Sequence, residues 1–278
     1  MRVLIILFIA FFSIYGTSCQ KELLSSDPSL KLDFSTDTMM FDTIFTTIGS
    51  STRHFKVYNR NKYDLNISSI KLAGSPNSPF RINIDGEPTN NAQNVYIRSN
   101  DSLFIFVEVT VNPNNDNAPL LISDSIVFET NGNIQDVKLI AWGQDVHLLN
   151  GVVLSGSNTF TSDKPYLIYD SLYISSGAEL TIEAGSRIHS HNGAWIIVEG
   201  RLIVNGEYDA PVIFEGDRLE PYYRDKPGQW GGIAFTYNSY NNSINWATIK
   251  NAIAGINTFP FANPDLILSQ KVCKASLS

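Results

Sequence analysis

The residues with the clearest catalytic potential are carboxylates in the second half of the chain, from Glu179 to Glu220. Two or three carboxylates on one side of a fold can act as general acid and base on a glycosidic bond, or can hold Ca²⁺. Such a site also needs Lys or Arg as a base or to stabilise charge. The candidates are Glu179, Glu183, Glu199, Glu207, Asp209, Glu215, Asp217 and Glu220.

Two histidines, His189 and His191, are separated by one residue. In a strand this spacing places both imidazoles on one face, where they could ligate a metal ion. No third or fourth ligand is evident nearby, so we expect a solvated strand face and no metal site. The sequence also has no Ser-His-Asp or GxSxG arrangement, and no phosphate-binding glycine motif surrounds Gly231-Gly232. We therefore expect no cofactor.

A charged, tyrosine-containing segment, residues 215–226, interrupts the pattern just before Trp230. Loops on rigid scaffolds often carry binding surfaces, and a flat aromatic face suits the C–H face of a pyranose ring. The predicted ligand-binding residues are Tyr222, Tyr223 and Trp230. The alternative for Trp230 is packing inside the fold.

The N-terminus has the features of a signal peptide, residues 1–18. Arg2 supplies positive charge, and the apolar run Val3–Tyr15 is shorter than the roughly 20 residues that span a bilayer as a helix. The small residues Gly16-Thr17-Ser18 then precede Cys19. This arrangement predicts an exported protein.

Cys19 and the residues before it resemble the lipobox of bacterial lipoproteins, in which the cysteine is acylated and becomes the N-terminus. The family usually has Leu three residues before the cysteine, where this chain has Gly16. The resemblance implies membrane attachment through lipid on Cys19. Residues 20–31 are polar, with Ser-Ser-Asp-Pro in the middle, which predicts a tether over residues 19–31. Gln20-Lys21-Glu22 resembles the signal that places Bacteroidota lipoproteins on the outer face of the outer membrane. The alternative is a soluble secreted or periplasmic protein.

Composition narrows the fold class and the partners. The 278 residues suffice for two domains, and the net charge is −7 with 20 scattered Lys and Arg, which argues against nucleic acid as a partner. Aromatic residues make up 12%, and many Ile, Val, Thr, Tyr and Phe occur in short runs typical of strands. We expect an all-β chain.

Residues 32–147 contain short alternating segments separated by turn residues. Phe80-Arg-Ile-Asn-Ile84, for example, alternates strictly and ends at Asp85-Gly86. This pattern predicts an antiparallel β-sandwich with one buried face per sheet. The predicted strands are residues 41–48, 53–58, 65–70, 80–84, 94–98, 103–111, 124–130 and 137–142.

The same segment resembles a known domain family. The motifs are Ser51–Asn59, Leu65–Ile70, Phe80, Val107–Pro113 and Leu139–Gly143. In this order they resemble the Ig-like domains of the abnormal-spindle and hydin type, which recur in bacterial surface proteins. The resemblance implies a binding or spacer module without enzymatic activity.

From residue 148 the period changes to about 22 residues. Leu180 and Ile182 recur as Leu202 and Val204, and Gly residues stand where the chain turns. Such a repeat is typical of a parallel β-solenoid, whose turns stack about 4.8 Å apart and share one core. Further along, Ile244 and Trp246 are predicted to recur as Leu266 and Leu268.

The repeat also tests the carboxylates. An offset of 22 places Arg201 beside Glu179, as an exposed ion pair worth about 0–1 kcal/mol. The same offset places Asn205 beside Glu183, which gives no second carboxylate. We therefore predict no catalytic residues.

The segments Gly228–Phe235 and Ile244–Ala252 resemble the right-handed parallel β-helix family, in its Bacteroidota lipoprotein branch. The resemblance covers residues 165–268, and an Ig-like domain followed by a β-helix is also similar to that branch. Relatives have many more turns, whereas about four can be counted here. Residues 148–278 are therefore predicted to be a short β-helix, which is either truncated or capped by Asn257–Ser278.

Together these observations predict a non-enzymatic surface lipoprotein. In this hypothesis the sandwich is a spacer and the outer face of the β-helix binds a glycan or a partner protein. One alternative is a polysaccharide lyase or hydrolase, or a degenerate relative, which three acids within about 10 Å on one stripe would favour. Another is a purely structural spacer in the envelope.

Overall fold

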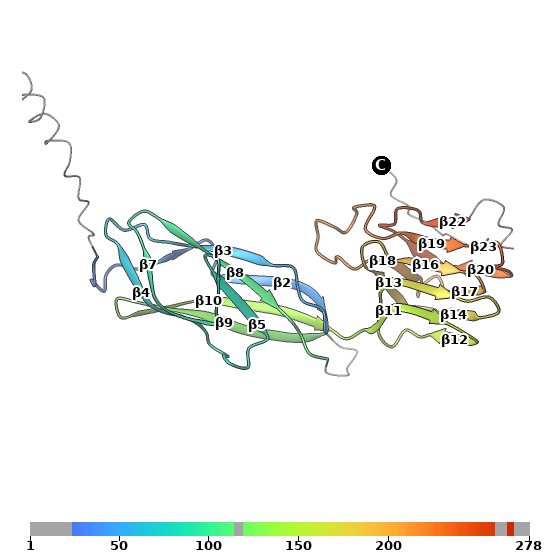
Figure 1. Cartoon of the computed structure of the whole chain (residues 1–278), viewed down its shortest axis with the longest axis horizontal. Helices are drawn as coiled ribbons and strands as arrows, with labels where there is room; N and C mark the ends of the chain where they lie inside the picture. Colours follow the sequence, from blue (N-terminus) through green and yellow to red (C-terminus); the bar gives the residue numbers. More distant parts are fainter. Residues whose placement is uncertain (1–23, 114–118, 259–265, 270–278) are drawn as a thin grey trace, which may run out of the picture. The chain divides into compact units, whose positions relative to one another are not determined.

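The computed structural model describes residues 24–113, 119–258 and 266–269. These residues form an all-β chain, as predicted (Figure 1). None of the described segments is a helix with the length and apolar character needed to cross a membrane. The predicted signal peptide, Cys19 and residues 270–278 lie outside the described residues.

Two five-stranded sheets form the N-terminal part of the chain. Their paired strands β1–β3, β3–β8, β5–β6, β4–β7 and β4–β9 run antiparallel. The first sheet has the order β1 (Asp33–Phe34), β3 (Arg53–Tyr58), β8 (Ser102–Val109), β5 (Phe80–Ile84) and β6 (Glu87–Pro88). The second has the order β2 (Thr38–Phe45), β10 (Asn133–Gln144), β9 (Leu120–Thr130), β4 (Leu65–Leu72) and β7 (Asn91–Ile97).

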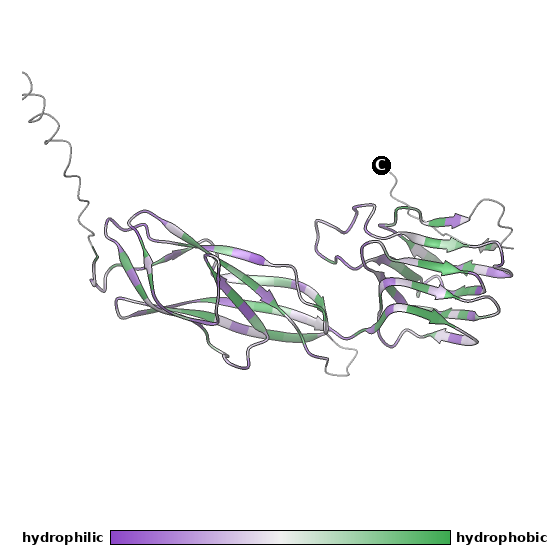
Figure 2. Cartoon of the chain, in the orientation of Figure 1, coloured by the Kyte–Doolittle hydropathy of each residue, from purple (hydrophilic) through white to green (hydrophobic). Residues whose placement is uncertain are grey.

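The alternation in the sequence explains why these sheets pack face to face. Phe80, Ile82 and Ile84 on β5 are buried, whereas Arg81 between them is exposed. Across the two sheets, the rings of Phe55 and Phe128 lie 6.3 Å apart. The green and purple residues that alternate along the strands in Figure 2 follow the same rule.

All eight strands predicted for the sandwich are present, two with the predicted ends and six with shifted ends. Strands β9 and β10 each begin four residues earlier than predicted, and β2 is displaced as a whole, to Thr38–Phe45 instead of residues 41–48. Thr47 has a φ of 68°, a left-handed conformation that a continuing strand does not adopt, so the strand ends before it.

The predicted tether is shorter than expected, because residues 24–31 are bound to the sandwich. The backbone N–H of Ser25 donates to the carbonyl of Asp64 at 3.0 Å. The side-chain amides of Asn131 and Asn133 donate to the carbonyls of Asp27 and Pro28. Composition alone suggested a free linker, but its backbone groups are hydrogen-bonded.

Strands β11–β23 form a coil with three faces, and all of their registered pairs are parallel (Figure 1). Two long strands, β11 (His147–Leu154) and β13 (Tyr166–Ile174), each contribute one half to face A and the other half to face B. Face A continues with β15 (Arg187–Ser190), β18 (Val212–Gly216) and β21 (Ala247–Ile249). Face B continues with β16 (Trp195–Val198), β19 (Gly232–Phe235) and β22 (Ile256–Thr258). Face C consists of β12 (Ser157–Phe160), β14 (Glu179–Glu183), β17 (Arg201–Asn205), β20 (Asn242–Asn245) and β23 (Leu266–Ser269).

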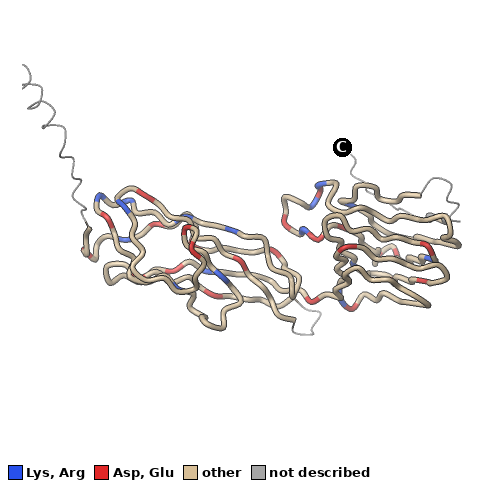
Figure 3. The backbone as a smooth tube through the Cα atoms, viewed as in Figure 1, with Lys and Arg blue, Asp and Glu red and all other residues tan. Residues whose placement is uncertain are grey.

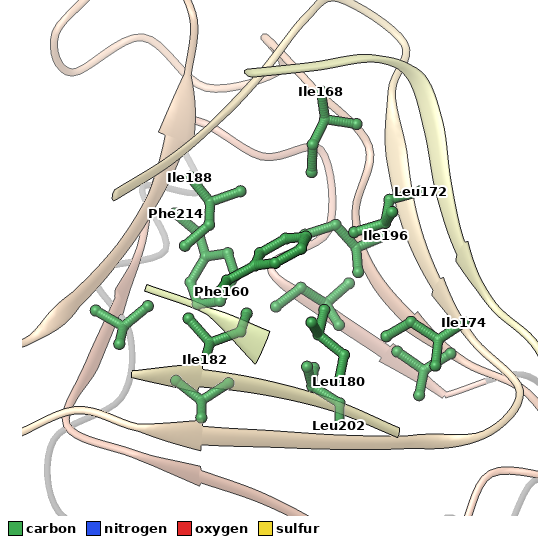
Figure 4. Close-up of a cluster of buried hydrophobic side chains, with 14 of the residues drawn as sticks. Phe160, Ile168, Leu172, Ile174, Leu180, Ile182, Ile188, Ile196, Leu202 and Phe214 are labelled. Atoms are coloured by element: carbon green, nitrogen blue, oxygen red, sulfur yellow. The ribbon is translucent and has the colours of Figure 1, made fainter. Parts of the chain in front are cut away.

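The register predicted from the 22-residue repeat is confirmed where the repeat is clearest. Leu180 pairs with Leu202 and Ile182 pairs with Val204, and the exposure of all four side chains is 0–1%. Figure 4 shows side chains from the three faces converging on Phe160 in the interior of the coil. Each turn thus buries its inner face against its neighbours.

Two details of the predicted coil are wrong. Each face has five strands within the described residues, whereas about four turns are predicted. The first turn departs from the repeat, since His147 pairs with Tyr166 at an offset of 19 (166 − 147) instead of 22. Ile244 pairs with Leu268, an offset of 24 (268 − 244) instead of 22. In addition, β22 and β23 continue the stack within the segment expected to form a cap.

By compactness the chain divides into two units that do not follow the sheets. Among the described residues, the first comprises 24–39, 52–108 and 124–139, and the second comprises 40–51, 109–113, 119–123, 140–258 and 266–269. The change from antiparallel to parallel pairing occurs between Gln144, the end of β10, and His147, the start of β11.

Candidate functional site

A long loop, residues 217–229, leaves face A after β18 and returns to the coil at Trp230. Its base is fixed by two side-chain amides. Gln229 donates to the carbonyls of Tyr223 at 2.5 Å and Lys226 at 2.8 Å. Asn251 donates to the carbonyls of Arg224 at 3.0 Å and Lys226 at 2.9 Å. The loop is therefore held to the coil by hydrogen bonds to its own backbone.

Tyr222 and Tyr223 project from this loop. The Tyr222 side chain is 69% exposed, and the two rings meet edge to face with centroids 5.0 Å apart. The Arg218 guanidinium lies 4.1 Å from the centre of the Tyr223 ring, and the Lys226 ammonium lies 5.0 Å from that of Tyr222. These cation–π contacts restrict both rings. Figure 3 shows residues of both charge signs on this loop.

Acidic residues in the loop offset its basic ones. Arg218 donates to both carboxylate oxygens of Glu220, with a shortest distance of 2.8 Å. Burial is the largest single influence and raises the pKa of Glu220, but the hydrogen bonds and charge of Arg218, together with hydrogen bonds from the Glu220 backbone and Ser51, outweigh it, so the pKa lies below the ordinary value. Glu220 is thus held as the anion that pairs with Arg218, and it is unsuited to act as a general acid.

The structure removes Trp230 from the predicted ligand-binding residues. Its side chain is fully buried in the core of the coil, and its Nε1–H donates to the Lys250 carbonyl at 2.9 Å. Neither face of the indole can reach a ligand. The alternative interpretation, packing inside the fold, is correct.

Next to the loop, β15 and β18 bring two imidazoles against two carboxylates. His189 Nδ1 lies 3.5 Å from Glu215 Oε1, and His191 Nδ1 lies 2.6 Å from Asp217 Oδ2. Lys250 extends the row, with its Nζ 2.5 Å from the other oxygen of Glu215. We call these five residues the imidazole–carboxylate ladder. Within it the Lys250 ammonium neutralises Glu215, whereas the two histidines carry charge only when protonated.

The expected solvated face for the two histidines is wrong for His189. Its side chain is 5% exposed, and the ring of Phe45, in the same compact unit, lies 4.9 Å away. Burial lowers the pKa of His189 below its ordinary value, against the opposing charge of Glu215. His191 is 41% exposed and stacks on Tyr169 with ring centres 4.0 Å apart.

The ladder was missed in the sequence because it does not follow the 22-residue repeat. Glu215 and Asp217 have the same spacing as His189 and His191, but His189 pairs with Glu215 at an offset of 26 (215 − 189). No group of three or more His, Cys, Asp or Glu that could hold a metal ion occurs within the described residues.

Within the described residues, two of the five other candidate carboxylates, Glu179 and Glu199, have side-chain partners. Glu179 pairs with Arg201 at 2.8 Å, as predicted, and Glu183 lies beside Asn205. Glu199 accepts hydrogen bonds from the Tyr173 hydroxyl and from Asn238. These bonds lower the pKa of Glu199, the Tyr173 bond most, so this carboxylate stays ionised.

Comparisons with known proteins give one family match. The family model described as "Pectate-lyase like beta helix domain" matches residues 151–261, so this region is of the β-helix type. A search of curated proteins found no match.

Among solved structures, the chain is similar to a protein of unknown function from Porphyromonas gingivalis W83. The identity is 13% and the TM-score is 0.31, over 45% of this chain and 60% of that one. A family 123 glycoside hydrolase from Clostridium perfringens matches at 9% identity and a TM-score of 0.31, over 48% and 30% of the two chains. A PapD-like domain of human CEP192 matches at 12% and 0.28, over 47% and 95%. The chain thus spans less than two thirds of the first two structures.

Proposed function

We propose that this chain is a non-enzymatic lipoprotein of the bacterial cell envelope that binds a glycan through the outside of its coil. The observation that supports this most directly is the Tyr222–Tyr223 pair, which is displayed on a loop whose base is hydrogen-bonded to the coil. Because the loop is already ordered, a ligand does not have to offset the entropy of ordering it.

The chemistry of the pair favours saccharides over other ligands. A tyrosine ring offers a flat apolar face to the C–H groups of a pyranose and a hydroxyl to its edge. The charged groups of the loop, Arg218 and Glu220 above all, can hydrogen-bond to sugar hydroxyls around that face. A surface protein recognised by the same residues is the second class of partner.

A polysaccharide lyase or hydrolase, or a degenerate relative of one, is the alternative function. The match to the pectate-lyase-like family is compatible with binding or with catalysis. Two carboxylates, Glu215 and Asp217, lie on one stripe, but each is engaged by Lys250, His189 or His191. Release of reducing ends or of unsaturated uronates from a bound glycan would favour the enzyme.

We predict that the double substitution Tyr222→Ala, Tyr223→Ala weakens binding by about 5- to 150-fold, because two aromatic contacts of about 0.5–1.5 kcal/mol each are lost. The measurement is a glycan array with the purified protein, followed by titration calorimetry with the best hit. Tyr237→Ala is the matched control, because Tyr237 is also an exposed tyrosine of the coil, at 71%.

An unchanged affinity in the double variant would contradict the proposed site. A loss of equal size in Tyr237→Ala would mean that the ligand recognises exposed tyrosines in general. Thermal unfolding of all three proteins checks that they are folded. Surface substitutions usually change the free energy of unfolding by less than about 0.5 kcal/mol, so the three proteins should unfold alike.

In this proposal the N-terminal sandwich is an Ig-like spacer, and lipid on Cys19 attaches the chain to the outer membrane, on the cell surface. Cys19 lies outside the described residues, so the support comes from the resemblance of its surroundings to a lipobox. A soluble secreted or periplasmic protein is the alternative.

The anchor predicts a labelling result. In cells fed an alkyne fatty acid, the wild-type protein should become labelled. Cys19→Ala should abolish the label and release the protein from the membrane fraction, because the acyl chains that anchor it are lost. Cys273→Ala is the matched control for thiol labelling. Equal labelling of wild type and Cys19→Ala would exclude the lipid anchor.

A further inference from the structure

A second aromatic pair, Tyr208 and the half-buried Trp246, lies at the corner where face C passes into face A. Tyr208 follows β17 and is 82% exposed. Its ring meets that of Trp246 edge to face, with centroids 5.3 Å apart and an interplanar angle of 85°. Because a core residue must be buried, Tyr208 does not contribute to the core of the coil.

The backbone of Trp246 is fixed in an unusual conformation. Its φ is 44°, in the left-handed region, which is uncommon for a bulky residue and costs roughly 1–2 kcal/mol. Its carbonyl accepts a hydrogen bond from the Val212 N–H at 3.0 Å. The same carbonyl lies so close to Gly206 that a Cβ there would be 2.1 Å away. The indole is therefore presented from a backbone that neighbouring turns hold in place, as at many functional sites.

A row of polar side chains leads along face C to the aromatic pair. Glu183, Asn205 and Asn245 are the last residues of β14, β17 and β20, and they are in register. Neighbouring strands lie about 4.8 Å apart, so these groups repeat at that spacing. Carboxylate and amide groups accept and donate hydrogen bonds, as an extended ligand with hydroxyls along its length requires.

The charge of this corner restricts the ligand. Glu183, Glu207 and Asp209 are exposed, and none of the ion pairs seen within the described residues involves them. Arg187, at the start of β15, stands against these three carboxylates, and the sequence has no Lys or Arg from residue 202 to 217, or from 227 to 249. A ligand with carboxylate or sulfate groups would meet like charge here, whereas a cationic ligand would be attracted.

We propose that Tyr208, Trp246 and the row Glu183–Asn205–Asn245 form a second saccharide-binding site, for oligosaccharides that carry protonated amino sugars. The ring pair stacks on the pyranose and also attracts its ammonium group. The polar row binds hydroxyls of the following sugar units. This site uses none of the residues of the Tyr222–Tyr223 loop, so it stands or fails independently of the function proposed above.

The test is titration calorimetry of the full chain with three hexasaccharides: β-1,4-linked glucosamine, N-acetylglucosamine and galacturonic acid. The glucosamine hexamer should bind, the N-acetylated hexamer should bind more weakly, and the galacturonate hexamer should show no binding. Tyr208→Ala should weaken binding of the glucosamine hexamer by about three- to tenfold. Glu207→Gln combined with Asp209→Asn should reduce the preference for glucosamine over N-acetylglucosamine and leave the fold intact.

Tyr237→Ala, which removes an exposed tyrosine outside both proposed sites, is the matched control and should retain glucosamine binding. Because Tyr208 is almost fully exposed, the melting temperature of the Tyr208→Ala variant should equal that of the wild type. Circular dichroism verifies that the variant is folded. The proposal is overturned if none of the hexamers binds, if galacturonate binds as well as glucosamine, or if Tyr208→Ala binds like the wild type.

Discussion

Trp230→Ala is expected to lower the free energy of unfolding of the coil by about 3–5 kcal/mol, the range for truncating a large buried aromatic residue. The Trp230 side chain is fully buried within the coil core. Its loss leaves a cavity and also leaves the Lys250 carbonyl without the Nε1–H donor that lies 2.9 Å away. The measurement is chemical denaturation followed by far-UV circular dichroism, which does not depend on the fluorescence of the removed indole.

The control for this prediction is Tyr222→Ala, a truncation in the loop that ends at Trp230. Tyr222 is 69% exposed, so its removal should change the free energy of unfolding by less than about 0.5 kcal/mol. Trp230→Phe, which keeps most of the volume but loses the N–H donor, should fall between the two. If Trp230→Ala unfolded like the wild type and only glycan binding were lost, the assignment of Trp230 to the core would be wrong.

The contrast between Trp230 and Tyr222 illustrates what the sequence could and could not predict. The sequence predicts strand positions well where buried residues recur regularly. Examples are the strict alternation of Phe80–Ile84 and the repeated pairs Leu180–Leu202 and Ile182–Val204, whose inner faces must all be buried. Trp230 also follows the repeat, because its bridge partner Ala252 lies 22 residues later (252 − 230). The offset alone does not say whether a side chain points into the coil, and the charged loop just before Trp230 favours an exposed position over the buried one that the structure shows.

The sites were hidden from the sequence for a related reason. Stacking brings together residues one turn apart, but the number of residues per turn changes wherever a loop is inserted. His189 and Glu215 are 26 residues apart (215 − 189), and Tyr208 and Trp246 are 38 apart (246 − 208), so neither pair follows the 22-residue offset. Core positions tolerate such loops without losing their alternation, whereas the outward-facing partners cannot be matched until the loop lengths are known.

Gly232→Ala is the second substitution with a large expected effect, at about 3–5 kcal/mol of the free energy of unfolding, the upper end for a point mutation. Gly232 has a φ of 130°, and a Cβ on it would lie 1.6 Å from the carbonyl oxygen of Ala254. That oxygen belongs to the backbone, so relief requires β19 to move away from the following turn. The Ile233 N–H donates to the Gly255 carbonyl at 3.1 Å, and this bond would be strained or lost.

Gly193→Ala separates the clash from the conformational effect. Gly193 also has a positive φ, 80°, but a Cβ there would meet nothing within 4 Å. Its substitution should therefore show only the left-handed penalty of about 1–2 kcal/mol. Hydrogen exchange should also increase at residues 254–258 in Gly232→Ala and remain unchanged there in Gly193→Ala, because only the first substitution pushes on the strand that follows. Equal losses of stability in the two variants would contradict this prediction. They would mean that residues 254–258 do not pack against β19 and that the stack on face B ends at β19.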